Sequence, residues 1–219
     1  MSSAQGTVGR VGPRQIGRGG RLHWAEHAAR DIVSKRIIVG FGFWIFLLSD
    51  IVMFSAFFAT YAVLTEATAG GPSGRDVFHL PVVAVETAFL LLSSFTCGIA
   101  SIGARARNNP MFYISMAITA AFGAGFLFLE IHEFAGMIAI GAGPTRSAFL
   151  SAFFTLVGCH GLHVTLGLLW LLTMMAQVFA KGYRADILRR MLCFSLFWHT
   201  LDIIWVAIFT VVYLMGVAV

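Results

Sequence analysis

Residues 37 to 64 read IIVGFGFWIFLLSDIVMFSAFFATYAVL, and Asp50 is their only charged side chain. A helix needs about 20 predominantly apolar residues to cross the hydrocarbon core of a bilayer, which is about 30 Å thick. This run is long enough to cross, and it is too long for the apolar part of a secretory signal. We interpret it as the first transmembrane span.

Four further apolar stretches of sufficient length follow, and Gly, Pro or Asn residues that break helices stand between them. The sequence therefore predicts an all-α fold, an integral membrane bundle of five transmembrane helices. The expected spans are approximately residues 36–64, 80–104, 111–138, 147–179 and 190–216. No soluble domain or internal repeat is recognised between them.

The first 30 residues differ from the rest of the chain. They are rich in Gly, Ser and Arg, and they lack the apolar periodicity of a packed helix. We expect residues 1–30 to form a flexible basic cytoplasmic tail and residues 31–219 to form the transmembrane domain.

The composition excludes two broad classes of protein. Hydrophobic residues make up 58% of the chain and charged residues only 11%, and a soluble domain of this size cannot bury so much apolar surface. The net charge of +5 does not indicate a nucleic-acid partner, because the basic residues lie at the ends of apolar stretches and form no stripe.

The same basic residues predict the orientation, because Lys and Arg are enriched on the cytoplasmic side of membrane proteins. All of them except Arg75 and Arg146 fall on the side of the N-terminal tail. We therefore expect the N-terminus in the cytoplasm and, after five crossings, the C-terminus in the periplasm.

The spans contain more ionisable residues than passive anchors need. Such groups are costly in a membrane unless paired, hydrated or neutralised, so each is a candidate functional residue that should face inward. The depths of these ionisable residues in the membrane suggest two polar layers, an outer layer that links spans two and three and a central layer that links spans one, four and five. The ionisable residues in the spans are Asp50, Glu86, Glu130, His132, Glu133, His160, His163, His199 and Asp202.

Residues three apart share a helix face, so Glu130 pairs with Glu133, and His199 with Asp202. The second pair is either a carboxylate-oriented imidazole or part of a hydrogen-bond network between helices. His160 and His163 also share a face, but a haem needs ligands from opposite sides, so neither a metal nor a bound cofactor is expected. No nucleophile accompanies the two glutamates, and no catalytic residue is expected in this chain.

Four motifs in order resemble subunit III of the haem-copper respiratory oxidases, and the likeness runs from about Phe41 to Gly216. The motifs are the Ser49-Asp50 pair before an aromatic run ending at Tyr61, the glutamates Glu130 and Glu133 after Gly125-Phe126, the stretch Phe153 to Val164 with His160-Gly161-Leu162-His163, and Phe197 to Trp205 with Trp198-His199 and Asp202.

Two features of the chain are similar to the cytochrome bo-type ubiquinol oxidases, namely five spans and Asp50 in place of Glu. The resemblance implies a subunit of a proton-pumping enzyme in the bacterial inner membrane, which oxidises ubiquinol and reduces dioxygen to water. It implies that the haems and copper lie in subunit I, that subunits I, II and IV are partners, and that this chain binds phospholipids but no redox centre.

The resemblance also nominates residues for lipid retention and proton uptake. Asp50 matches the family's membrane-embedded acid and is the foremost candidate, whereas Glu86 matches no motif. Two alternatives stay open, a subunit III of a cytochrome c oxidase and an independent proton-coupled transporter. The remaining candidates are Glu130, Glu133, His160, His163, His199 and Asp202.

Overall fold

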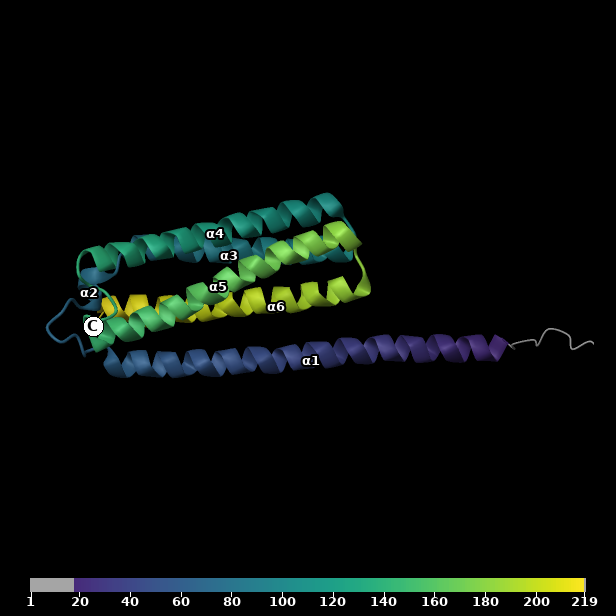
Figure 1. Cartoon of the computed structure of the whole chain (residues 1–219), viewed down its shortest axis with the longest axis horizontal. Helices are drawn as coiled ribbons and strands as arrows, with labels where there is room; N and C mark the ends of the chain where they lie inside the picture. The colour runs from purple at the N-terminus through teal and green to yellow at the C-terminus, as the bar shows by residue number, and fades with distance from the viewer. Residues whose placement is uncertain (1–17, 219) are drawn as a thin grey trace, which may run out of the picture. The chain divides into compact units, whose positions relative to one another are not determined.

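The computed structural model describes the backbone of residues 18–218 and the side chains of residues 37–75 and 77–217. That part of the chain is helical and contains no strand (Figure 1). The elements in order are α1 (Arg18–Leu64), α2 (Gly74–Val77), α3 (Leu80–Arg105), α4 (Asn109–Ala139), α5 (Ala148–Lys181), α6 (Ala185–Ile208), the π-helix η1 (Phe209–Leu214) and α7 (Met215–Ala218).

Among the described residues, five helical runs are long and apolar enough to cross a membrane, which confirms the predicted number of spans. The observed runs are longer than predicted at several ends, because polar residues taken for connectors, such as Asn109 and Lys181, belong to α4 and α5. The residue before each of these helices caps it: the Asn108 side chain accepts a hydrogen bond from the Met111 backbone at 3.2 Å, and the Ser147 side chain caps α5 in the same way. The runs are Ile37–Leu64, Leu80–Arg105, Asn109–Ala139, Ala148–Lys181 and Ala185–Val217.

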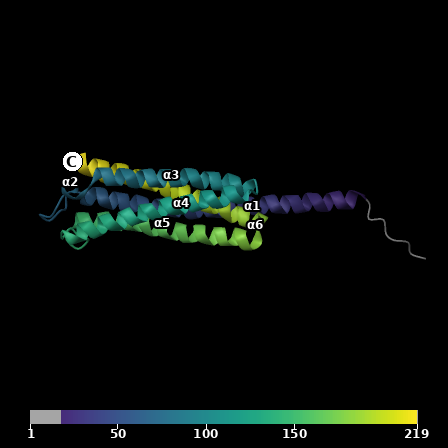
Figure 2. The ribbon, with the colours of Figure 1, turned by 90° about the horizontal axis from the view of Figure 1, so that it is seen from above.

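The predicted tail lies outside the described residues as far as residue 17, and α1 already includes residues 18–30. The chain divides after Phe41 into two units, and the packing reported below is that of the second, Gly42–Val219. Within this unit α3 to α6 run alongside one another, as Figures 1 and 2 show. Contacts join α3 to α4 and α6, and α5 to α4 and α6.

Hydrogen bonds between side chains form a seam between the antiparallel helices α3 and α6. The Trp205 indole N–H donates to Thr87 Oγ1, and the Trp198 indole N–H donates to Ser93 Oγ, each at 3.0 Å. One residue further along, Ser94 shares a hydrogen bond of 2.7 Å with His199 Nδ1. We refer to these three contacts as the α3–α6 seam.

The membrane part of α1 buries a narrow stripe. Leu47, Phe54 and Tyr61 are 1–2% exposed and are seven residues apart, which is close to two helical turns. The Tyr61 ring packs 5.9 Å from Phe149 of α5, and its hydroxyl donates to the Val212 carbonyl of η1 at 3.3 Å. Most of the other side chains of residues 37–64 face outward and are apolar, as expected of a lipid-facing surface.

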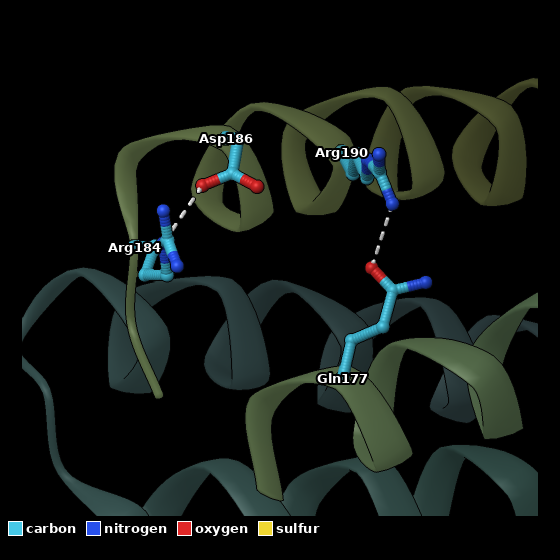
Figure 3. Close-up of polar contacts among 4 residues, drawn as sticks. All are labelled: Gln177, Arg184, Asp186 and Arg190. Carbon is cyan, nitrogen blue, oxygen red and sulfur yellow. Dashed lines mark hydrogen bonds and ion pairs between the residues drawn. The ribbon is translucent and has the colours of Figure 1, made fainter. Parts of the chain in front are cut away.

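The turn between α5 and α6 carries exposed polar contacts, which Figure 3 shows. Arg190 donates to the Gln177 side chain at 3.0 Å, and Arg184 lies 3.6 Å from Asp186. Ion pairs this exposed contribute little to stability. The basic residues of this turn therefore matter more for the orientation of the chain in the membrane than for the stability of the fold.

Trp198 lies at the centre of the bundle and is 1% exposed. Glycines on two helices leave room for its indole ring. A Cβ atom added at Gly167 of α5 would lie 2.8 Å from the ring, and one added at Gly123 of α4 would lie 3.0 Å from it. These glycines allow α4 and α5 to approach α6 closely, which is how helices associate in a lipid environment.

We predict that Gly167→Ala lowers the free energy of unfolding by about 1–3 kcal/mol, the usual cost of overpacking a core. The Trp198 ring cannot shift freely because its N–H is bonded to Ser93. The matched control is Gly98→Ala, where the added Cβ meets no atom within 4 Å, so stability should be unchanged or slightly higher. Detergent unfolding followed by tryptophan fluorescence measures both, and equal effects would contradict the prediction.

Candidate functional site

Most of the ionisable side chains within the spans fall into three groups, and His132 and His160 lie outside them. The acid cluster consists of Glu86, Glu130 and Glu133 with Tyr213. The second group is the pair Asp50–His163, and the third is the notch, which we define as the hollow between α3 and α6 lined by Leu91, Ser94, His199, Asp202, Ile203 and Val206.

The acid cluster brings together carboxyl groups from α3 and α4. Glu86, Glu130 and Glu133 are 0%, 3% and 9% exposed, and they lie within electrostatic range of one another. The Tyr213 hydroxyl donates to Glu133 Oε2 at 3.3 Å. Among the described atoms, both oxygens of Glu86 and one oxygen of each other glutamate have no hydrogen-bond partner. The cluster therefore has more acceptors than the surrounding side chains satisfy.

Two local features build this cluster. Gly161 of α5 leaves space for the Glu130 carboxyl, because a Cβ there would lie 2.6 and 2.7 Å from its two oxygens. Tyr213 lies in the π-helix η1, which buries both Val212 and Tyr213. Such single π-turns are frequent at functional sites. Glu133 also borders a hollow of about 390 Å³ near the ends of α3 and α4, which His79 and His132 line.

His160 is fully buried, and neither ring nitrogen has a hydrogen-bond partner among the described atoms. Its ring packs 5.1 Å from that of Trp205 and 5.8 Å, edge-on, from that of Phe126. Within the described part of the chain, no three His, Cys, Asp or Glu side chains are placed to hold a metal ion. The surroundings of His160 are those of an aromatic core.

Asp50 and His163 connect α1 with α5. They lie within electrostatic range of each other, and His163 Nδ1 lies 2.7 Å from the Cys159 carbonyl oxygen. The Phe54 ring packs edge-on at 5.4 Å from the His163 ring. Asp50 is half-buried, so its carboxyl is accessible from the surface of the bundle. The expected link between spans one and four is present.

Asp202 does not lie with Asp50 and His163, although the sequence predicted a central polar layer that links spans one, four and five. It lies in the notch, because the face of α6 that carries it packs beside α3. His199 pairs with Ser94, so its observed contact is a hydrogen bond between helices and not one to the neighbouring carboxylate. Asp202 is 8% exposed, and its Oδ1 has no partner among the described atoms.

Three residues of these groups, Glu86, Ser94 and Tyr213, were not nominated by the family resemblance. Glu86 matched no motif, although an acid within a span was itself a signal. Ser94 is a common small polar residue, and its role depends on which helix faces it. Tyr213 reaches Glu133 from η1, and the sequence does not reveal a π-helix.

Comparison with known proteins gives consistent results. The family described as "Cytochrome c oxidase subunit III" matches residues 24–217. The chain is 56% identical to the cytochrome bo(3) ubiquinol oxidase subunit 3 of Pseudomonas aeruginosa, over 80% of this chain and 84% of that protein. It is 46% identical to the cytochrome c oxidase subunit 3 of Bacillus sp. PS3, over 80% of this chain and 84% of that protein. It is 45% identical to the quinol oxidase subunit 3 of Bacillus subtilis, over 80% of this chain and 86% of that protein.

These relatives are subunits of oxidases, and the described part of the chain has five helices able to cross a membrane. Together these findings identify a multi-pass inner-membrane protein and a subunit of a terminal oxidase complex. The chain belongs to the cytochrome c oxidase subunit III family, the subunit III family of the haem-copper oxidases.

Proposed function

We propose that this chain is the subunit III of a cytochrome bo-type oxidase that takes electrons from ubiquinol. The observation that carries the choice of donor is that two relatives above 50% identity, at 56% and 53%, are both named ubiquinol oxidase subunits. A relative named a cytochrome c oxidase subunit is 46% identical, and three others named ubiquinol oxidase subunits are 42–43% identical. In this proposal the donor is bound by other subunits of the complex.

In this proposal the chain holds no catalytic site of its own, and the haems and copper belong to subunit I. Its direct partner is subunit I, with subunits II and IV in the same complex. Its contribution is to stabilise subunit I, to retain phospholipids and to support proton uptake. The buried polar groups fit this role, because contacts such as Ser94–His199 and Tyr213–Glu133 join different helices.

The donor is tested by purifying the oxidase through an affinity tag on this chain. We expect haem to co-purify, and oxygen consumption to be supported by ubiquinol and not by reduced cytochrome c. Activity with cytochrome c alone, or a dinuclear copper site in subunit II, would show that the chain serves a cytochrome c oxidase. Recovery of the chain without haem would overturn the proposed function as a whole.

Asp50 is the side chain of this subunit that we propose to act beyond packing. It is half-buried at mid-span beside His163, so its carboxyl is accessible from outside the bundle, where most of the surface of residues 37–64 is apolar. The Asn variant retains the shape of the side chain and removes its charge.

We predict that Asp50→Asn leaves the assembled complex and its initial rate largely intact, but lowers its phospholipid content or shortens its active lifetime during turnover. Lipid analysis by mass spectrometry and prolonged oxygen-electrode traces measure the two effects. Glu66→Gln is the control, because it changes an exposed carboxyl just beyond the end of α1. Unchanged lipid content and lifetime in Asp50→Asn would reduce Asp50 to a packing residue.

We further propose that the N-terminus lies in the cytoplasm and the C-terminus in the periplasm, since basic residues are concentrated on one side. In intact cells, a membrane-impermeant maleimide should label Arg146→Cys, which follows α4, and should not label Arg184→Cys, which precedes α6. Both positions are exposed. The unaltered chain, with Cys97, Cys159 and Cys193, gives the background, and the reverse labelling pattern would invert the topology.

A further inference from the structure

The acid cluster lies toward the end of the bundle that carries the turn between α4 and α5. Glu86 is six residues from Leu80, the first residue of α3, and Glu133 is six residues from Ala139, the last residue of α4. At a rise of 1.5 Å per residue, about 9 Å of helix separates each of them from that end. Glu130 lies almost one turn deeper. The cluster is therefore inside the membrane but close to one of its surfaces.

The three carboxyl groups of the cluster are enclosed without a balancing positive charge. Their side chains are 0–9% exposed, and within the described residues no basic side chain lies within ion-pairing distance of them. A carboxylate in such surroundings loses its hydration, and neighbouring negative charges repel one another. Three ionised carboxylates in this place would be costly on both counts.

Glu86 shows most clearly that the cluster lacks a partner of another kind. It is fully buried on α3, and neither of its oxygens has a hydrogen-bond partner among the described atoms. It is also within electrostatic range of both Glu130 and Glu133. A carboxylate only accepts hydrogen bonds, whereas a protonated carboxyl carries no charge and adds a donor of its own. A bound proton therefore removes the charge that these surroundings do not balance.

Glu133 is the carboxyl of the cluster that lies nearest to outside water. It borders the hollow of about 390 Å³, which the exposed side chains of His79 and His132 also line. Its unpartnered oxygen is sealed from the hollow, so the carboxyl must rotate to meet water there. Its contact with the Tyr213 hydroxyl, at 3.3 Å, is longer than a usual O–H···O hydrogen bond. Little therefore opposes that rotation.

We propose that the acid cluster is a proton-binding site, which keeps Glu86 and Glu130 protonated at neutral pH and exchanges protons with the water in the hollow through Glu133. In the exchange, the O–H bond of the Glu133 carboxyl breaks, its proton passes to a water molecule, and the negative charge stays on the carboxylate. The Tyr213 hydroxyl then donates a charge-assisted hydrogen bond to that carboxylate. The reverse step returns one proton and restores the neutral cluster.

Other titratable side chains surround this site from several elements. The histidines at the hollow are exposed, whereas both His160 nitrogens are buried without a partner among the described atoms. The Tyr213 hydroxyl is the described side-chain group that contacts a carboxyl of the cluster, so the exchange step is assigned to this pair. The surrounding groups are His79 before α3, Glu86 of α3, Glu130, His132 and Glu133 of α4, His160 of α5 and Tyr213 of η1.

The test is infrared spectroscopy of the assembled oxidase in lipid nanodiscs, where a protonated carboxyl gives a carbonyl band above the amide bands. Glu86→Gln and Glu130→Gln should each remove one such band at neutral pH, and in the unaltered complex these bands should shift in heavy water. Glu66→Gln, which changes an exposed carboxyl, is the control and should remove none. A spectrum that neither Gln variant alters would show that both carboxyls are ionised, which would overturn the proposal.

Two further variants test the role assigned to Glu133. Glu133→Gln should slow the hydrogen–deuterium exchange of the Glu86 and Glu130 bands, and exchange at an unaltered rate would contradict the proposed route. At acidic pH, Tyr213→Phe should raise the frequency of the Glu133 carbonyl band, because that oxygen loses its donor. Tyr113→Phe, at the opposite end of α4, should leave the band in place. Equal spectra of the two Phe variants would refute the Tyr213 contact.

The same samples separate this inference from the function proposed above. Gln is nearly isosteric with a protonated Glu and is equally uncharged, so the Gln variants should assemble with their haem. If one does not assemble, the heavy-water shift and the Tyr213→Phe spectrum still decide the question. Carboxylate bands that appear only with added Na⁺ or K⁺ would assign a metal cation to the cluster instead. If haem co-purifies but no band of the cluster is found, the proton site is wrong and the oxidase assignment stands.

Discussion

The hydrogen-bonded seam between α3 and α6 is the interaction on which the remaining architecture depends. In a bilayer, apolar side chains gain little by leaving lipid for protein, so close packing and polar contacts must hold helices together. The seam supplies both, because Trp198 and Trp205 fill the space between helices while their N–H groups bond Ser93 and Thr87. The glycines at positions 123 and 167 fit around the first of these rings.

The seam also separates the two polar sites that flank it. The acid cluster lies on its inner side, where Glu86 of α3 meets the glutamates of α4 and Tyr213. The notch with Asp202 lies on its outer side, where the surface is otherwise apolar. One helix pair thus carries a polar site enclosed by its own chain and a polar site at the surface of the bundle.

The number of spans and their approximate bounds followed from the sequence, because the length of an apolar run is a direct consequence of bilayer thickness. The i, i+3 pairing of Glu130 with Glu133 likewise followed from helical geometry. The residues that each polar side chain contacts could not be predicted, because they depend on which helices pack against each other. Asp202 was expected beside spans one and four and lies beside α3, and Glu86, without a motif, proved to belong to the acid cluster.

The π-helix at residues 209–214 makes the end of the chain sensitive to length. Each residue of an α-helix turns the chain by about 100°, so the loss of one residue here would swing Tyr213 away from Glu133 and displace the Val212 carbonyl from Tyr61. A substitution within this segment alters one side chain, whereas a deletion would break contacts to both α1 and α4 at once. The number of residues between Trp205 and Tyr213 is therefore as important for the structure as their identities.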